Sequence, residues 1–182
     1  MKTLDRTEAH KLWNQYWHDM NQEWFKVEVL QDYTGEDDSP SLRAWLAGDK
    51  QKSLALLKQA AHNGWREMCQ EKHNAGVLMR RIRIIEKPST PYTEWEIEFY
   101  KRVNILGGEQ IFIVNKQDVA HLNLPSGDLM MFDNKRVSVC SYDKSGRVVQ
   151  QTFYDESDDI AKFLQLKHDL LPLARPLQDQ QL

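Results

Sequence analysis

The stretch that most constrains the fold runs from Val77 to Phe153. It opens with an apolar and basic run, residues 77–85 (VLMRRIRII), whose length and β-branched content are typical of a strand. An amphipathic helix follows and ends at Gly107-Gly108, and a short apolar run then covers residues 110–114. This order of strand, helix and strand predicts a β-α-β crossover with its two strands parallel in one sheet.

The remainder of this stretch predicts three more strands. Residues 128–132, 136–142 and 147–153 are short strand-like runs, and the turns between them are tight. A last helix is expected over 155–171, where apolar residues recur at helical spacing. We therefore expect an α+β fold, in which a mixed sheet (a β-α-β unit and then a three-strand antiparallel meander) is packed by helices.

The first part of the chain has a different predicted content of secondary structure. Residues 1–76 are expected to form a mainly helical N-terminal region with one strand, at residues 24–30. Residues 77–175 would form the α/β core and residues 176–182 a frayed tail, all within one compact domain. Helices are predicted at 5–19, around Leu42–Leu46, at 50–62 and at 65–73.

Composition excludes several classes of protein. The net charge of the 182 residues is −3, which argues against a general nucleic-acid binder. No apolar run approaches the roughly 18 residues that span a bilayer, and residues 1–6 show no signal-peptide core. We therefore expect a cytoplasmic protein with no membrane association. The two cysteines, Cys69 and Cys140, are too few for a disulfide framework.

A candidate polar centre comes from the alternation of the 77–85 strand. Arg81 and Arg83 share one face of it, and Glu96 lies on the helix stripe that must face the sheet. Because a buried unpaired carboxylate costs several kcal/mol, Glu96 is expected to pair with Arg81 or Arg83. Such a pair either fixes the helix on the strand or leaves arginines to line a pocket for an anionic ligand, since the guanidinium fork fits carboxylate and phosphate.

Three further residues are candidates for the same centre. Tyr92 lies on the stripe of Glu96, and Asp128 and Asp133 bracket the 128–132 strand, where Asp133 also suits a turn. The sequence has no phosphate-binding glycine loop and no nucleophile elbow. Cys69 and His73 have the i, i+4 spacing of a zinc pair but no second pair, so neither a metal nor a cofactor is predicted.

Several segments together resemble a bacterial, mainly actinobacterial, family of unknown function that is encoded beside helix-turn-helix regulators. The C-terminal half also looks loosely like half of a phospholipase-D-like domain, but it lacks the catalytic H-x-K-x4-D pattern, so no active phosphodiesterase is implied. The resemblance implies a regulatory or accessory role. It rests on FKVE (25–28) with Tyr33, WLAGD (45–49), RIRII (81–85) with Pro88, Tyr92, Trp95 and Glu96, Asn104, Gly108-Glu109, Leu124-Pro125 with Asp128, Phe132-Asp133, and Tyr142-Asp143 with Gly146.

Two hypotheses of function follow. The first is a non-enzymatic regulatory or accessory protein that binds a protein partner, such as a helix-turn-helix regulator, or a small anionic ligand. Its binding residues would be Arg81, Arg83, Tyr92, Glu96, Asp128 and Asp133. The second is an uncharacterised enzyme, for example of a biosynthetic cluster, that uses the same polar centre. Neither hypothesis specifies an oligomeric state.

Overall fold

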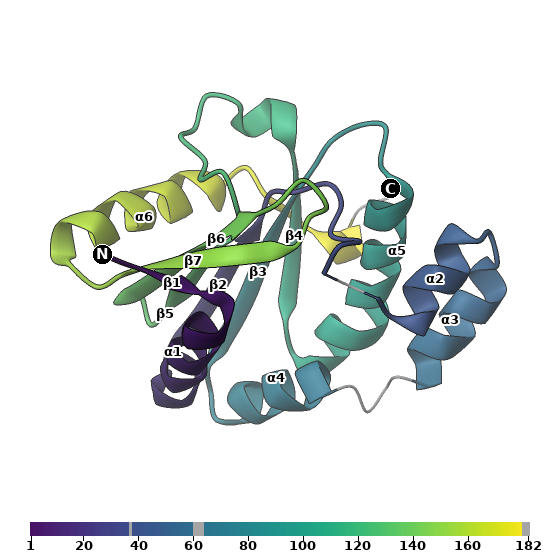
Figure 1. Ribbon diagram of the computed structural model, residues 1–182, viewed down its shortest axis with the longest axis horizontal. Helices are drawn as coiled ribbons and strands as arrows, with labels where there is room; N and C mark the ends of the chain where they lie inside the picture. The colour runs from purple at the N-terminus through teal and green to yellow at the C-terminus, as the bar shows by residue number, and fades with distance from the viewer. Residues whose placement is uncertain (37, 60–63, 180–182) are drawn as a thin grey trace.

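The protein is built on one mixed eight-stranded sheet, seen in a computed structural model that describes residues 1–36, 38–59 and 64–179 (Figure 1). The strand order is β1-β7-β6-β5-β2-β3-β4-β8. The strands are β1 (Lys2–Asp5), β2 (Glu23–Glu28), β3 (Leu78–Ile85), β4 (Gln110–Asn115), β5 (Leu129–Phe132), β6 (Arg136–Tyr142), β7 (Val148–Tyr154) and β8 (Arg175–Pro176). The helices are α1 (Arg6–Asp19), α2 (Pro40–Leu46), α3 (Lys50–Gln59), α4 (Gly64–Asn74), α5 (Pro91–Phe99) and α6 (Ser157–Leu170).

The predicted crossover and meander are both confirmed, and the fold is α+β. Strand β3 pairs in parallel with β4, and α5 lies between them in the chain. The helix continues as a π-helical turn over Tyr100–Asn104 and a 3-10 turn over Ile105–Gly107, and it stops at Gly108, whose φ of +91° suits glycine. Strands β5, β6 and β7 are antiparallel neighbours in sequence order.

The N-terminal region contributes two strands, so the expectation of one strand there is wrong. Strand β1 pairs antiparallel with β7 at one edge of the sheet, and Asp5 at its end caps α1 by accepting from the backbone N–H groups of Thr7 and Glu8. The sequence does not indicate strand β1, because its four residues are mostly polar and form a strand only by pairing with β7, which is distant in the chain. The boundary at residue 76 between the N-terminal region and the α/β core stays a prediction. The helix predicted at 50–62 was expected to end at His62, which lies within residues 60–63, outside the described part of the chain.

The expected frayed tail also needs correction over residues 176–179. Strand β8 pairs with β4, and a 3-10 turn over Leu177–Asp179 follows it. Leu177 is only 1% exposed, because it packs among Ile111, Ile113 and neighbouring apolar residues at that edge of the sheet. Burial of this one leucine holds the segment in place. Residues 180–182 lie outside the described part of the chain.

The two faces of the sheet are covered differently (Figure 1). Helix α6 and the 3-10 turn Lys116–Val119 pack on one face, over an apolar core that includes Phe25, Val27, Ile82 and Ile84. Helices α1, α4 and α5 lie on the opposite face, and α2 and α3 pack outside α5. Because α1 and α5 are separate helices on one face, the sheet between them is not fully covered.

Candidate functional site

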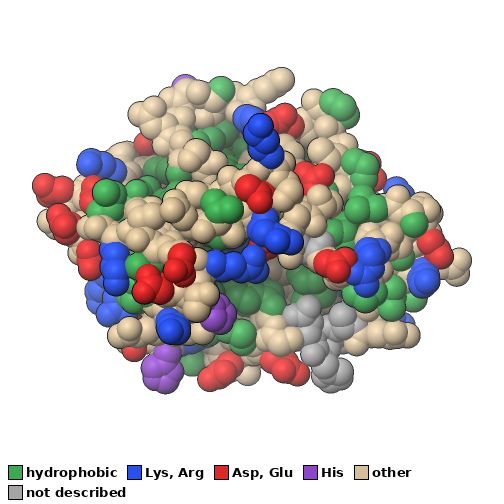
Figure 2. Space-filling model, viewed as in Figure 1, with side chains coloured by type: hydrophobic (Ala, Val, Ile, Leu, Met, Phe, Trp, Pro, Cys, Tyr) green, Lys and Arg blue, Asp and Glu red, His purple; other side chains and the backbone are tan. Residues whose placement is uncertain are grey.

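A cleft of about 650 Å³ opens between α1 and α5, with the sheet as its floor. The floor comes from β2, β5, β6 and β7, and the loop after β2 closes one side. Figure 2 shows hydrophobic side chains recessed behind basic and acidic ones on this view of the molecule. The lining residues are Arg6, Ala9, His10, Trp13, Lys26, Glu28, Tyr33, Glu36, Asp38, Tyr92, Glu96, Asp128, Met130, Cys140, Tyr142, Val148 and Gln151.

Strand alternation places the charged side chains beneath this cleft. Along β2, Phe25 and Val27 face α6, so Lys26 and Glu28 project to the opposite face. The parallel register of β2 and β3 pairs Lys26 with Arg81 and Glu28 with Arg83. Three cations, Lys26, Arg81 and Arg83, thus meet the carboxylate of Glu28 on one face, in the middle of the sheet and not at its edge.

These side chains form a connected buried network. Arg81 binds Glu28 and Glu109, each at 2.6 Å between nitrogen and oxygen. Lys26 binds Glu28 at 2.6 Å and lies 3.5 Å from Asp128. The Tyr100 hydroxyl donates a short hydrogen bond to the second oxygen of Glu28. Each of these groups therefore has the partner that a buried polar group needs.

Glu96 completes the network from α5. Its Oε2 accepts a hydrogen bond from Nε of Arg83 at 2.6 Å, which confirms the pair expected from the sequence. Arg81, the other partner considered for Glu96, binds Glu28 and Glu109 instead. The guanidinium of Arg83 is fully buried and stacks over the Tyr33 ring at 5.4 Å.

The network holds more carboxylates than cations. Among the described residues, Glu28, Glu96, Glu109 and Asp128 are paired with three positive side chains. Burial and the nearby charge of Glu28 raise the pKa of Glu96 to about 7, although Arg83 opposes that rise. For Glu28 the burial penalty is outweighed by Arg81 and Lys26, which hold its pKa well below the ordinary value. The carboxyl of Glu96 is therefore partly protonated near neutral pH.

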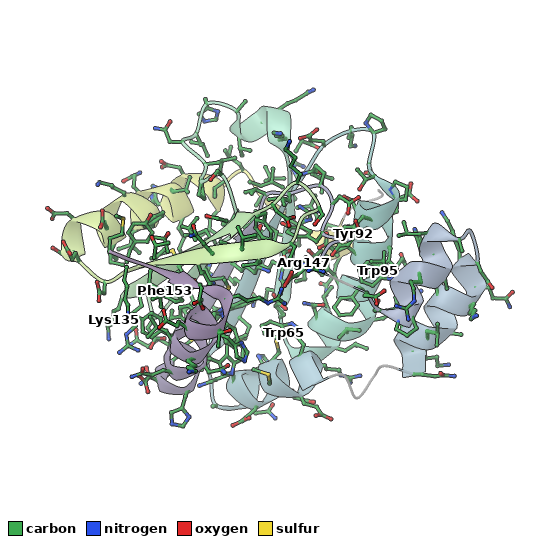
Figure 3. The ribbon with its side chains drawn as sticks, in the orientation of Figure 1. Trp65, Tyr92, Trp95, Lys135, Arg147 and Phe153 are labelled. Carbon is green, nitrogen blue, oxygen red and sulfur yellow. The ribbon has the colours of Figure 1, made fainter. Side chains whose placement is uncertain are left out.

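Tyrosine rings form the wall beside these carboxylates. The Tyr33 hydroxyl donates to Asp128 at 2.6 Å, and burial followed by the charge of Asp128 raises the pKa of Tyr33 well above 10. The Tyr33 ring lies 5.6 Å from that of Tyr92 and 5.5 Å from that of Tyr142. Figure 3 shows Tyr92 on α5, and Trp95 on the side of α5 toward α2, where its indole donates to Ser41 at 3.0 Å.

The structure brings three of the predicted site residues into the cleft and keeps three out of its lining. Tyr92, Glu96 and Asp128 line it, whereas Arg81 and Arg83 lie behind the carboxylates. Asp133 belongs to the β5–β6 turn. Its φ is +54° and its carboxylate accepts from the backbone N–H groups of Asn21, Gln22 and Glu23, so it acts as a turn residue away from the cleft.

Sequence reasoning missed Lys26, Glu28 and Glu109. The alternation of residues 24–30 placed Lys26 and Glu28 together on a polar face of the strand, but that pattern is equally typical of a solvent-facing edge strand. Their burial follows from the position of β2 between β5 and β3, which is set by pairings across more than fifty residues. Glu109 follows the glycine stop of the helix and, apart from the family resemblance of Gly108-Glu109, nothing in the sequence marks it as a site residue.

Within residues 1–36, 38–59 and 64–179, no group of three or more His, Cys, Asp or Glu side chains is arranged to hold a metal ion. Cys140 lines the cleft, and burial raises the pKa of its thiol to about 12, so it remains protonated at neutral pH. None of the described helices is both long and apolar enough to cross a membrane.

Comparisons with known proteins assign the chain to a family but do not assign it a function. No match to a curated protein was found. An archaeal chromatin protein, TrmBL2, whose structure shows a novel mode of DNA binding, is 13% identical over 96% of this chain and 53% of its own, with a TM-score of 0.44. This chain thus spans about half of that protein.

The phospholipase D family member Nuc from Salmonella typhimurium is 11% identical over 96% of this chain and 95% of its own, with a TM-score of 0.49. A family model, by contrast, matches residues 11–180, which is nearly the whole chain. On that match, the protein belongs to the family of domains of unknown function DUF6879.

Proposed function

We propose that the protein is a non-enzymatic regulatory or accessory protein that binds a small ligand in the cleft between α1 and α5. The observation that carries this proposal is the cleft itself. Its volume of about 650 Å³ lies within the range of small-molecule sites, and buried polar groups from β2, α5 and the start of β5 converge on its floor.

The chemistry of the lining supports binding more than catalysis. The strongest nucleophile on the cleft wall, the Cys140 thiol, is protonated at neutral pH. The ammonium of Lys26 is paired with Glu28 and Asp128, which favour its charged form, and a charged amine is a poor nucleophile. Groups that are paired with one another in this way recognise a ligand by shape and charge without attacking it.

We further propose a setting for this binding. In it, the protein is cytoplasmic and bacterial, and its ligand state is passed to a partner protein such as a helix-turn-helix regulator. The support for this setting is the family resemblance of segments such as RIRII (81–85). Partner and setting are tested by affinity purification from the native host with identification of the retained proteins.

Filling the cleft tests the proposal. Val148 at the start of β7 lines the cleft, while Val149 is 44% exposed and absent from the lining, so Val148→Trp blocks the cleft and Val149→Trp is its matched control. Native mass spectrometry of the three proteins, each purified from the native host, should find one small-molecule mass on wild type and Val149→Trp but not on Val148→Trp. An adduct that survives Val148→Trp, or no adduct on any of them, would contradict the proposal.

An enzyme that uses the same centre is the second candidate. One observation favours it: a carboxyl with a pKa of about 7, such as Glu96, suits a general acid or base at neutral pH. Incubating the protein with host metabolite extract, and comparing Glu96→Gln with wild type by mass spectrometry, separates the two candidates. Turnover of a metabolite by wild type alone supports the enzyme; retention of an unchanged metabolite supports the binding protein.

A further inference from the structure

The charges and rings that face the cleft define a ligand class, an inference that rests on the proposed function. We infer that the cleft binds an organic ammonium ion, whose N–H groups donate to Glu96 and whose carbon frame packs on the tyrosine rings. Four features of the described residues carry this inference: the enclosure of the arginines, the excess of carboxylates, the free oxygen of Glu96 and the aromatic wall.

The arginines are already paired with carboxylates. Neither Arg81 nor Arg83 lines the cleft, although Arg81 lines an adjoining cavity of about 310 Å³, and both bind carboxylates at 2.6 Å. Nη2 of Arg83 lacks a hydrogen-bond partner, but the residue is 0% exposed and is separated from the cleft by Glu96 and the Tyr33 ring. The small anionic ligand expected from the sequence would have to displace Glu96 to reach it.

Carboxylates outnumber cations on the cleft wall itself. Five acidic side chains line the cleft, against Lys26, Arg6 and His10. Lys26 is bound by two of these acids, and Arg6 pairs with Glu36 at 2.7 Å at the cleft mouth. The five acids are Glu28, Glu36, Asp38, Glu96 and Asp128. A cavity wall with this balance attracts a positive ligand and repels a negative one.

Glu96 offers the specific contact. Its Oε2 is used by Arg83, while its Oε1 has no hydrogen-bond partner among the described residues. The side chain is 7% exposed and lines the cleft, so a ligand in the cleft can reach it. An ammonium group would supply the donor that Oε1 lacks. It would also supply the fourth positive charge that the four buried carboxylates require.

The aromatic wall completes the site. The rings of Tyr33, Tyr92 and Tyr142 form a continuous group with centroid separations of 5.6 and 5.5 Å, and Trp13 faces them from α1. Aromatic faces attract cations and pack against a hydrocarbon frame. Acidic groups beside several rings are the combination that selects an amine over a neutral molecule of equal size.

Three matched probes on the intact protein test the inference: 2-phenylethylamine, 2-phenylethanol and phenylacetate, which differ in charge but little in shape. Amide NMR titration of wild type should show 2-phenylethylamine binding at least about tenfold more tightly than 2-phenylethanol, with phenylacetate weakest. Shifts should concentrate at residues that line the cleft. The Val148→Trp variant should lose the amine, while Val149→Trp should keep it.

The possible failures are distinct. If phenylacetate binds as tightly as the amine or more tightly, or if the three probes bind alike, the ammonium inference is overturned while small-ligand binding in the cleft survives. If no probe shifts the cleft residues at 10 mM, on the order of a 3 kcal/mol affinity, both the inference and the proposed function are overturned. Amine binding that persists in Val148→Trp places the site elsewhere and also overturns the inference.

Discussion

Two ion clusters lie on opposite faces of β2 and β3, and they differ in their balance of charge and in whether a cavity lies beside them. On the α6 face, Glu23 accepts from Arg80 at 2.9 Å and from Lys167 at 2.5 Å, and Asn134 donates to it at 3.1 Å. Lys167 in turn donates to the Asn134 side-chain oxygen at 2.7 Å. One carboxylate thus meets two cations, and this α6-side cluster lines none of the cavities described above.

The cluster on the α5 face has the opposite balance and a cavity beside it. Burial disfavours the charged form of Glu23, yet Lys167 and Arg80 lower its pKa, whereas the pKa of Glu96 rises to about 7. A closed cluster with sufficient positive charge fixes a helix on a sheet. An open one that lacks a positive charge and faces a cleft has the properties of a binding site. Charge balance and the presence of a cavity distinguish a structural cluster from a binding site better than burial does, because the central carboxylates of both clusters are buried.

The largest expected effect is on the α5 side. Glu28→Gln leaves Arg81 and Lys26 with one carboxylate each and should lower the free energy of unfolding by about 3–5 kcal/mol. Urea unfolding followed by circular dichroism measures it. Glu86→Gln, which breaks only an exposed pair with Lys116, is the control and should change stability by less than about 1 kcal/mol. Equal losses for the two variants would mean that the network adds nothing beyond surface pairing.

The next effect concerns pH. Glu96 has a raised pKa, so between about pH 4.5 and pH 7 the folded protein holds a proton that the unfolded chain has released. The free energy of unfolding should therefore fall as pH rises through this window, by about 3 kcal/mol in all, since one pKa unit corresponds to 1.36 kcal/mol. Glu96→Gln should remove this slope.

Urea unfolding at pH 4.5, 5.5, 6.5 and 7.5 checks this slope. Glu94→Gln is the matched control, because Glu94 lies on the same helix and makes only an exposed pair with Lys50. It should keep the wild-type slope. A wild-type curve that is flat or rises across the window would show that Glu96 ionises normally and that the cluster lacks no charge.

A smaller effect is expected on the α6 side. Lys167→Met keeps the apolar stem but removes the ammonium that binds Glu23 and Asn134, and it should cost about 1–2 kcal/mol, since Arg80 still pairs with Glu23. Affinity for 2-phenylethylamine should not change, because this cluster lies on the far face of the sheet. A loss of affinity larger than about threefold would show that the two clusters are coupled.

The sequence alone predicted the crossover, the meander and the pairing of Glu96 with Arg81 or Arg83, because each depends on local periodicity and on a short loop between neighbouring elements; the structure has the pair with Arg83. It did not predict the cleft. Lys26 and Glu28 become a buried floor only when β2 is inserted between β5 and β3. The partner of Arg81 could not be chosen either, since Glu28 and Glu109 reach it through the sheet register.

The most direct test is a carboxyl ¹³C NMR titration of the folded protein that resolves Glu96 and Glu23 in one series of spectra. The pKa of Glu96 should be near 7 and should fall when 2-phenylethylamine is added, while that of Glu23 should lie below 4.5 and should not respond to the amine. A pKa of Glu96 at or below 4.5 in the free protein would contradict the distinction between an open and a closed cluster.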